Sequence, residues 1–323
     1  MSTDTDSRAE KESIRHNSED RYTIVVHGGT VSTPGEVTDA QLELTRAVVT
    51  GARSHLAAGE TALDTVVNAI VALEDSGLLD AGKGSFLNTA GFVENDATIM
   101  QGETGRTGAV AAMQRLKNPI NGALIAMERT PHALFAGPAG EETLVQLGAE
   151  TVCDPATYFR LRARLQIPND EGTVGAVALD QYGNLAAGTS TGGTPGQLVG
   201  RVGDSSIVGA GTFANERYAL SATGVGEYFI KRSATREIAN RAERQGQSLQ
   251  DAADYVICRL IGEIDKASGA VIAIGNDGEI ALASNVYGEL YGYATENVDV
   301  TVGVELPLSR QAARTLRSRN ERV

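Results

Sequence analysis

Residues 170–211 read DEGTVGAVALDQYGNLAAGTSTGGTPGQLVGRVGDSSIVGAG. Runs of small and β-branched residues alternate here with Asp, Gly and Asn, which is typical of short strands joined by tight turns. TVGAVALD and GNLAAGTST flank the turn DQYGN and are predicted strands, and SSIVGAGTF is a third. Thr173 is then the first residue of a strand, and Gly172 directly precedes it.

On either side of this stretch, strands and helices are segregated rather than strictly alternating. The predictions rest on apolar residues at helical or alternating spacing, and on turn residues where a run ends. Before the stretch, the predicted elements are a strand over YTIVVHGG (22–29), helices over 44–59 and 62–77, a helix over 108–116, a strand-like ALIAM (123–127) and a helix pair over 131–148, followed by a flexible linker over 152–172. After it, the predicted elements are helices over 226–244 and 246–264, and a strand, turn and strand over 269–285. This order favours an α+β fold in which sheets pack together with helices outside.

The composition narrows the class of protein. The chain has 323 residues and 41% hydrophobic content, which is enough to bury a sizeable core. Its formal net charge of -13 argues against a nucleic-acid partner, because phosphate backbones are bound through clustered Lys and Arg. Residues 1–20 are polar, charged and free of aromatics, so we expect a disordered acidic extension there.

Neither a membrane segment nor a secretion signal is visible. No run approaches the roughly 18 apolar residues that cross a bilayer. Residues 1–20 lack the apolar stretch of a signal peptide, so we expect a cytoplasmic protein without a membrane partner. Cys153 and Cys258 cannot form a disulfide framework and have no metal-ligand spacing, and no cofactor is predicted from them.

The residues around position 173 suggest a nucleophile. The chain has no histidine after His132, so chemistry in its second half needs another base. A threonine hydroxyl is a weak nucleophile unless a base is adjacent. If the chain were cut before Thr173, the new α-amino group, with a reference pKa of roughly 7.7–8.0, would supply that base. Gly172 has no Cβ, which lets the Thr173 hydroxyl approach its carbonyl in an N-to-O acyl shift. A Gly-Thr pair by itself usually does no more than begin a strand.

At this point the chain resembles the plant-type asparaginase and isoaspartyl aminopeptidase family of threonine-nucleophile, N-terminal-nucleophile (Ntn) hydrolases. The motifs that carry the resemblance are GTVGAVALD, TSTGG, GRVGDS and TGVGE, with VVHGG, LDAGKGSFLN and DATIM before them. The resemblance covers residues 22 to about 290. It implies one structural domain with a four-layer αββα Ntn-hydrolase sandwich. Self-cleavage would divide this domain into an α-subunit half, residues 21–172, and a β-subunit half, residues 173–323.

The resemblance also implies catalytic roles. Thr173 would be the nucleophile, and Thr191 of TSTGG would hydrogen-bond its hydroxyl and orient it. Thr223 and Gly224 of TGVGE would donate to the oxyanion of the tetrahedral intermediate. Without the motif, Thr191 would be interpreted as a strand residue that faces solvent.

The implied substrates are L-asparagine and β-aspartyl (isoaspartyl) dipeptides, which share a charged α-amino acid head. Arg201 of GRVGD would bind the α-carboxylate, because a guanidinium fork matches a planar carboxylate. Asp204 would take the α-ammonium, and the Gly226 carbonyl would assist it. Outside this motif, Arg201 and Asp204 would be interpreted as a surface pair. The implied assembly is a homodimer of cleaved αβ protomers.

A structural monovalent cation, usually sodium, is also implied by the family. Backbone carbonyls of the loop LEDSGLLDAGKG (73–84) would hold it, so no side-chain signature is expected. The positions that match are Leu73, Glu74, Ser76, Leu79, Ala81 and Lys83.

Two places depart from the family's pattern. Asp80 stands in LDAGKG where the family usually has asparagine, thought to lie near the oxyanion site. An ionised carboxylate there would oppose the developing negative charge, unless it is protonated, paired, for example with Lys83, or turned away. The run His27-Gly28-Gly29 is followed by TVSTPGEV rather than the AG of relatives. In relatives this run forms a loop near the scissile bond, but here a plain turn that ends a strand is almost as good an interpretation.

Two other functions stay open. A glycosylasparaginase would hydrolyse the amide between a sugar and asparagine, but TSTGG, the lack of tryptophan and the lack of a signal peptide count against it. A precursor that never processes efficiently would act as a scaffold or binding protein. Asp80 and the altered glycine run are the support for that second alternative.

Overall fold

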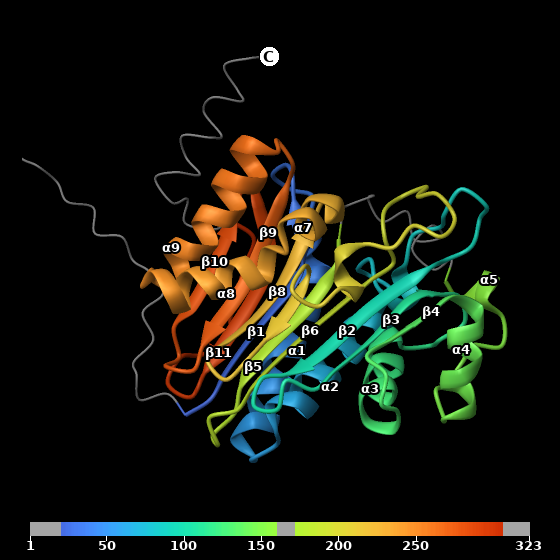
Figure 1. The fold of residues 1–323 in the computed structure, drawn as a ribbon, viewed down its shortest axis with the longest axis horizontal. Coiled ribbons are helices and arrows are strands. Elements are labelled where there is room, and N and C mark those ends of the chain that lie inside the picture. The colour runs from blue at the N-terminus through green and yellow to red at the C-terminus, as the bar shows by residue number, and fades with distance from the viewer. Residues whose placement is uncertain (1–20, 160–171, 306–323) are drawn as a thin grey trace, which may run out of the picture.

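The computed structural model describes residues 21–159 and 172–305. It contains two β-sheets flanked by helices, as the predicted α+β class requires (Figure 1). The predicted disordered extension, most of the predicted linker and the end of the predicted β-subunit half lie outside the described residues.

The larger sheet has eight strands within the described residues, in the order β12-β11-β1-β5-β6-β2-β3-β4. Neighbouring strands in it are antiparallel except β3 and β4, which are parallel. The predicted hairpin between residues 174 and 191 is confirmed as β5 and β6. The strands of this sheet are β1 (Thr23–Val31), β2 (Asn95–Gln101), β3 (Thr107–Met113), β4 (Leu134–Ala136), β5 (Val174–Leu179), β6 (Leu185–Thr191), β11 (Gly288–Thr295) and β12 (Thr301–Gly303).

The smaller sheet has four strands among the described residues, in the order β10-β9-β8-β7, and all its pairs are antiparallel. Its strands are β7 (Thr212–Ala214), β8 (Tyr218–Gly224), β9 (Gly269–Gly275) and β10 (Ile280–Ser284). The helical elements are α1 (Asp39–Ala57), α2 (Ala62–Ser76), η1 (Gly82–Gly84), α3 (Pro119–Arg129), α4 (Gly137–Gln146), α5 (Pro155–Tyr158), η2 (Asp204–Ser206), α7 (Gly226–Arg232), α8 (Ala234–Gln245), α9 (Leu249–Asp254) and the π-helix η3 (Tyr255–Ile264).

Both faces of the larger sheet are buried. In β1, Ile24 and Val26 belong to the hydrophobic cluster that contains residues of α1, α2 and α3. Val25 between them belongs to a second cluster, which contains residues of β8, β9, α8 and α9. Successive side chains of a strand point to opposite faces, so one face of β1 packs on the first helices and the other on the second cluster.

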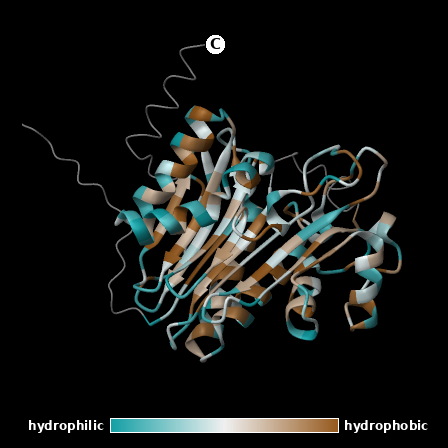
Figure 2. Ribbon diagram, viewed as in Figure 1, coloured by the Kyte–Doolittle hydropathy of each residue, from teal (hydrophilic) through white to brown (hydrophobic). Residues whose placement is uncertain are grey.

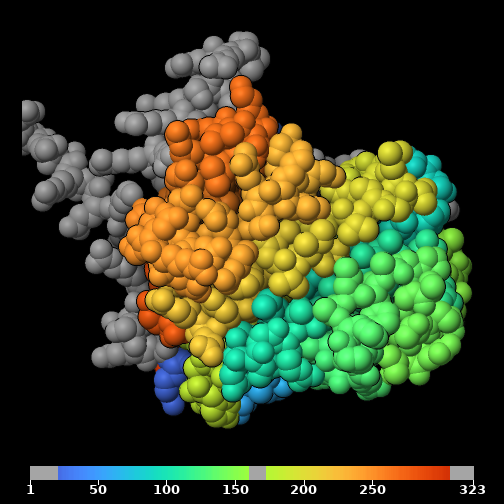
Figure 3. All heavy atoms as spheres, in the orientation of Figure 1, coloured from blue at the N-terminus to red at the C-terminus, as the bar shows by residue number. Residues whose placement is uncertain are grey.

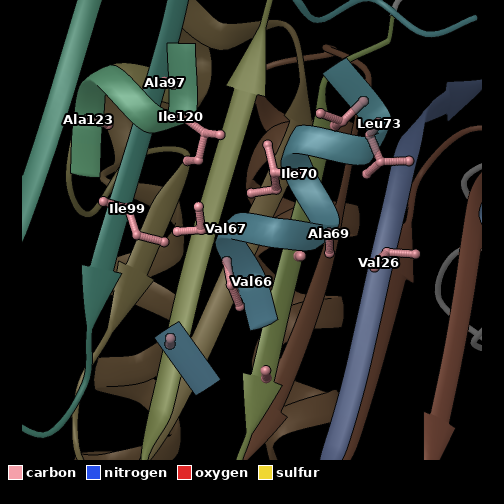
Figure 4. Packing of buried hydrophobic residues seen from close by; sticks show 14 of the residues in the cluster. Val26, Val66, Val67, Ala69, Ile70, Leu73, Ala97, Ile99, Ile120 and Ala123 are labelled. Atoms are coloured by element: carbon pink, nitrogen blue, oxygen red, sulfur yellow. The ribbon is translucent and has the colours of Figure 1, made fainter. Parts of the chain in front are cut away.

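Helix α2 covers the first of these faces. Figure 4 shows Val66, Ile70 and Leu73 of this helix lying over the middle of the sheet, between the strand that carries Ile99 and the strand that carries Val26. Helical spacing of these apolar residues explains why the segment folds as an amphipathic helix. Hydrophobic residues also run along the strands and the helices of the C-terminal half, drawn in brown in Figure 2.

The ends of α2 are set by local sequence. Thr61 caps its start by accepting a hydrogen bond from the Asp64 amide. Gly77 ends the helix with a left-handed φ of 69°, a conformation that favours glycine. The chain then turns into the loop over residues 77–84, which carries Asp80.

Five predicted elements were wrong. SSIVGAGTF is not a strand over its whole length, because it begins in the 3-10 helix η2 and only its last two residues belong to β7. The predicted helix pair over 131–148 is strand β4 followed by the single helix α4.

The other three concern β1, β3 and α3. Residues 108–116 are mostly strand β3 rather than helix, and ALIAM lies inside helix α3. The run Gly108-Ala-Val-Ala-Ala fits both patterns, and its pairing with β2 makes it a strand. His27-Gly28-Gly29 is neither a loop nor the end of a strand, because β1 continues to Val31 through a bulge where Gly29 has a φ of 108°.

In the space-filling view, the C-terminal helices (orange) and the α3–α4 region (green) form opposite ends of the visible face (Figure 3). Residues coloured yellow, from about position 190 to about 220, lie between them. Within the described ranges, no helix has the length and apolar character needed to traverse a lipid bilayer.

Candidate active site

Thr173 and Thr191 meet at the ends of two neighbouring strands. Thr173 directly precedes β5, and Thr191 is the last residue of β6. The Thr173 hydroxyl donates a hydrogen bond to Thr191 Oγ1 over 3.1 Å. Thr191 is 3% exposed, so it does not face solvent as a plain strand residue would. Its Oγ1 also accepts the Gly193 amide, which orients the hydroxyl group.

Thr223 and Gly224 end β8 in the smaller sheet. Thr223 is buried, and Gly224 has a φ of 141°. A Cβ on Gly224 would lie 2.5 Å from the Ser268 carbonyl oxygen, so only glycine fits there. No direct hydrogen bond joins Thr223 to Thr173 in the described part of the chain. The end of β8 is connected to the start of β5 through His27 instead.

His27 lies between the two sheets at this end of β1. Its Nε2 is 2.9 Å from Ser221 Oγ of β8, and the Thr173 backbone is close enough to the ring to act on its pKa. Burial lowers the pKa of His27 to about 3, so the ring is neutral near pH 7. The sequence offered no signal for this role beyond the VVHGG motif, which was interpreted through its glycines.

The three residues predicted to bind the charged head of the substrate lie together. A Cβ on Gly226 would lie 2.6 Å from Asp204 Oδ1 and 3.2 Å from Arg201 Nη2. Glycine at the start of α7 therefore allows the carboxyl and the guanidinium to approach that helix. Asp204 starts η2 and is 5% exposed, while the Arg201 side chain is 18% exposed. Arg201 and Asp204 are thus not a surface pair.

The carboxyl group of Asp204 has an unusual pKa. Burial raises the pKa of its carboxyl to about 7, although the Arg201 guanidinium acts in the opposite direction. Its Oδ2 has no hydrogen-bond partner within residues 21–159 and 172–305. Asp96 lies nearby and accepts the amides of Ala112 and Gly203, and burial raises its pKa to about 6. A bound ammonium group would give the Asp204 carboxyl the partner that it lacks.

Two partners of Arg201 were missed from the sequence. The Glu227 carboxylate accepts from Arg201 Nε over 3.1 Å and from Nη2 over 3.3 Å. Gln197 Oε1 accepts from Nη1 over 3.3 Å. The hydrogen bonds from Arg201 lower the pKa of the Glu227 carboxyl. Glu227 is the last residue of the TGVGE motif, but a separation of 26 residues from Arg201 gave no sign of the contact.

Asp80 is fully buried beside the strand end that carries Thr191. Its Oδ1 accepts the Phe86 amide over 3.1 Å, and its backbone carbonyl accepts the Gly192 amide over 3.1 Å. A Cβ on Gly192 would lie only 2.5 Å from Asp80 Oδ1. The carboxyl group therefore points inward, next to the residue that follows Thr191. The Lys83 ammonium lies 5.6 Å from the centre of the Tyr158 ring.

The loop predicted to hold a cation begins at the C-terminal end of α2. Carbonyls at a helix C-terminus carry partial negative charge, and the last turn of α2 contains no basic residue. A Cβ on Gly84 would lie 2.0 Å from the Leu79 carbonyl oxygen, and one on Gly82 would lie 3.0 Å from that of Glu74. These two carbonyl oxygens therefore pack against the glycines of η1, which wraps back on α2. Backbone carbonyl oxygens of this loop, called the carbonyl cradle below, are of the ligand type that a hard monovalent cation takes.

Side-chain metal sites are a separate matter. Among the described residues, no three or more His, Cys, Asp or Glu side chains gather in a way that could hold a metal ion. This says nothing about the carbonyl cradle, because backbone oxygens are not counted in such a group.

The sequence was compared with protein families and with characterised proteins. A sequence model of the asparaginase family matches residues 20–167 and 162–304. An isoaspartyl peptidase of Escherichia coli is 38% identical over 302 residues, which cover 84% of this chain and 92% of that protein. An isoaspartyl peptidase of Salmonella typhimurium is 37% identical, with 84% and 95% coverage. A human isoaspartyl peptidase/L-asparaginase is 38% identical over 275 residues, with 79% and 87% coverage.

Proposed function

The chain belongs to the asparaginase family, and from that premise we propose that it is an isoaspartyl peptidase/L-asparaginase that activates itself by cutting between Gly172 and Thr173. The observation that carries the proposal is the 3.1 Å hydrogen bond from the Thr173 hydroxyl to Thr191. It holds a nucleophile at the start of a buried strand, directly after the peptide bond to be cut.

Self-cleavage follows from this arrangement. The Thr173 hydroxyl attacks the Gly172 carbonyl carbon, a C–O bond forms, and the C–N bond to Thr173 breaks. Water then hydrolyses the resulting ester, which leaves a Gly172 carboxylate and a free Thr173 α-amine. The amine then serves as the general base for the second reaction.

Hydrolysis of the substrate uses the same hydroxyl. The α-amine of Thr173 takes the hydroxyl proton while the oxygen attacks the β-carbonyl carbon of the aspartyl group. Thr223 and Gly224 donate to the oxyanion, and ammonia or an amino acid leaves with the proton. Water then attacks the β-aspartyl ester, releasing L-aspartate and restoring the hydroxyl. Loss of a single oxyanion donor typically costs about 3 kcal/mol of transition-state energy.

The charged head of the substrate would bind on the side of the scissile amide that is opposite to the leaving group. Asp204 would pair with the α-ammonium, helped by the Gly226 carbonyl. Arg201 would bind the α-carboxylate, which competes with Glu227 for the guanidinium. A substrate that lacks either charge cannot pair with both Arg201 and Asp204, so we expect simple amides to be poor substrates.

Three further features belong to this proposal. The two sheets with their flanking helices would form the four-layer αββα sandwich of Ntn hydrolases, since the larger sheet is buried on both faces. The cleaved αβ protomers would pair as a homodimer, which light scattering can check. A sodium ion would sit in the carbonyl cradle of Leu73, Glu74, Ser76, Leu79, Ala81 and Lys83 and hold the shape of the loop that carries Asp80.

The deciding experiment is the intact mass of the purified protein and of Thr173→Ala. We expect two fragments that meet at Gly172 and Thr173 in the natural protein, and one uncut, inactive chain in the variant. Thr173→Ser is the matched control, because it keeps a hydroxyl and should cleave slowly. Turnover of L-asparagine by Thr173→Ala would exclude Thr173 as the nucleophile. An uncut natural protein would favour the scaffold alternative, and a preference for sugar-linked asparagine would favour a glycosylasparaginase.

A further inference from the structure

A chain of buried side-chain hydrogen bonds connects the two sheets. His27 Nε2 lies 2.9 Å from Ser221 Oγ, and Ser221 Oγ lies 2.7 Å from Thr189 Oγ1. Thr212 Oγ1 donates to Thr189 Oγ1 over 2.6 Å. None of the four residues is more than 1% exposed. The chain thus links β1 and β6 of the larger sheet to β8 and β7 of the smaller one.

This layer lies directly beneath the proposed catalytic threonines. Thr189 is two residues before Thr191 on β6, and Ser221 is two residues before Thr223 on β8. Residues two apart on a strand share a face, so the hydroxyl chain and the site lie on the same faces of both strands. Further along the same face of β6, Ala187 joins the apolar cluster between the sheets. The hydroxyl chain therefore separates that cluster from the site.

Gly175 makes room for the histidine at this level. It pairs with His27 across β1 and β5 and is two residues after Thr173. A Cβ on Gly175 would lie 2.0 Å from Ser221 Oγ and 2.3 Å from His27 Nε2. The His27 ring therefore packs directly on β5, two residues after Thr173. One neutral ring thereby contacts the strand of the nucleophile and the strand of the oxyanion residues.

We propose that His27, Ser221, Thr189 and Thr212 form a positioning layer that sets the spacing between the two sheets beneath the active site. That spacing determines how far Thr173 lies from Thr223 and Gly224. The inference rests on the proposed function, because it takes Thr173 as the nucleophile. A misplacement of about 1 Å at a reacting group costs on the order of a hundredfold in rate. The layer would matter twice, because self-cleavage and hydrolysis use the same hydroxyl.

The same residues do not make a second nucleophilic site. Glu289 Oε1 lies 3.8 Å from His27 Nδ1. The hydroxyl of Ser221, the ring of His27 and the carboxyl of Glu289 are therefore arranged in the order of a nucleophile, its base and an acidic residue. However, the side chains of His27 and Glu289 are completely buried, and Ser221 has no exposed surface for a substrate to reach. Burial raises the pKa of Glu289 well above its usual range and lowers the pKa of His27 to about 3, so burial favours the neutral form of both side chains. The layer can position neighbouring groups without leaving a buried charge.

The test compares isosteric variants of one residue. Thr189→Val removes the hydroxyl and keeps the shape, whereas Thr189→Ser keeps the hydroxyl. Thr98→Val is the matched control, because Thr98 is buried opposite Thr189 on β2 and its hydroxyl has no hydrogen-bond partner among the described residues. We measure the rate of self-cleavage, kcat and KM for L-asparagine, and the melting temperature.

We expect Thr189→Val to slow self-cleavage and to lower kcat by about tenfold or more, with KM within about twofold of the natural value. Thr189→Ser should recover most of both rates, and Thr98→Val should behave like the natural protein. A structural role alone would lower the melting temperature without this selective loss of kcat. If Thr189→Val does not fold, Thr212→Val removes the donor at the far end of the same chain and is judged by the same criteria.

The positioning layer is overturned if Thr189→Val cleaves itself and turns over substrate as fast as Thr98→Val. It is also overturned if the variant raises KM and leaves kcat unchanged. Thr173→Ala tests the proposed function separately. If Thr173→Ala is uncut and inactive while Thr189→Val is normal, the positioning layer alone fails. If Thr173→Ala is active, the proposed function fails, and the positioning layer fails with it because it assumes that nucleophile.

Discussion

In the proposed substrate site, Asp204 is the residue whose ionisation we expect to matter most. Burial raises the pKa of its carboxyl to about 7, and the carboxylate is needed to attract an α-ammonium. As the pH falls through 7, the group becomes protonated and loses this attraction. We therefore expect the inhibition constant of L-aspartate to rise at acid pH, approaching a factor of about ten per pH unit.

Inhibition kinetics from about pH 5.5 to about pH 8.5 check this expectation. Asp204→Asn is the comparison, because it has no carboxyl to titrate. Its inhibition constant should be high at every pH and should not show the acid rise. An inhibition constant of the natural protein that is flat across this range would mean that Asp204 does not bind the ammonium group.

Asp80 is the second residue whose charge bears on the rate. Its buried carboxyl lies beside Gly192, the residue that follows Thr191. If it is ionised near the oxyanion, it opposes the negative charge of the transition state. Asp80→Asn keeps an acceptor oxygen for the Phe86 amide and removes the charge, so we expect kcat for L-asparagine to increase several-fold.

Asp75→Asn is a suitable control for this change. Asp75 is exposed on α2 and accepts a hydrogen bond from the Asn118 side chain. The variant therefore removes the same formal charge, but at an exposed position and not at the buried one beside Thr191. Steady-state kinetics of both variants decide the matter. An unchanged kcat and pH profile for Asp80→Asn would show that the charge of Asp80 does not act on the reaction.

At the scale of elements, helix α2 and the loop after it form one functional unit. The helix ends at Gly77, its last turn contains no basic residue, and the loop returns over this end as η1. We propose that a sodium ion holds this loop together. We therefore expect the melting temperature to be several degrees higher in sodium chloride than in an equal concentration of choline chloride.

Gly84→Ala tests the same unit from the protein side. Its Cβ would lie 2.0 Å from the Leu79 carbonyl oxygen and would have to displace it. The variant should melt at the same temperature in both salts. Gly51→Ala is the control, because a Cβ there meets no atom within 4 Å. Equal melting temperatures of the natural protein in the two salts would contradict a cation in the loop.

Strand β5 is the other element with a direct role. Its start carries Thr173, and its neighbours β1 and β6 carry His27 and Thr191. Because β5 pairs with β6 from Val174 and with β1 from Gly175, Thr173 directly precedes a segment that is held on both sides. This explains why the hydroxyl of Thr173 is already oriented in the uncut chain.

At the scale of the whole molecule, buried acids make stability depend on pH. Burial raises the pKa of Glu74 to about 8, and that of Asp96 and Asp204 to about 6 and about 7. Each group holds its proton more tightly when folded than when unfolded. The unfolded chain therefore ionises first, and stability is lost as the pH rises from about 4.5 to about 8. His27, with its lowered pKa, acts oppositely, and its contribution is lost below about pH 6.5.

Glu74→Gln isolates the largest of these effects. The Glu74 carboxyl accepts the Ile120 amide and the Ser190 hydroxyl through Oε1, which a glutamine oxygen can replace. In the uncut Thr173→Ala background, urea unfolding should show little change at pH 5. At pH 9 the variant should be more stable by more than about 1 kcal/mol, since one pKa unit corresponds to about 1.4 kcal/mol. If the variant and its parent are equally stable at both pH values, the folded protein does not hold Glu74 as a buried, protonated carboxyl group.

Much of this protein follows from local sequence patterns. The hairpin of β5 and β6, the helices α1 and α2 and the α+β class were predicted, because spacing of apolar residues and turn chemistry act over a few residues. The candidate nucleophile Thr173 and its partner Thr191 were predicted from the family motifs, and the lack of a later histidine supported the use of an α-amino group as base. The cytoplasmic location, the dimer and the sodium ion stay predictions.

Contacts between distant segments depended on the tertiary structure. Residues 108–116 became a strand because β2 pairs with them, although their alternation of Gly, Ala and Val carries little preference. The fork of Glu227 on Arg201 and the chain from His27 to Thr212 join residues that no periodicity relates. The charge states of Asp204, Glu74 and His27 depend on burial, which only the packed fold creates. Local spacing determines which residues share a face of a strand, but folding determines which faces meet and which side chains lose contact with water.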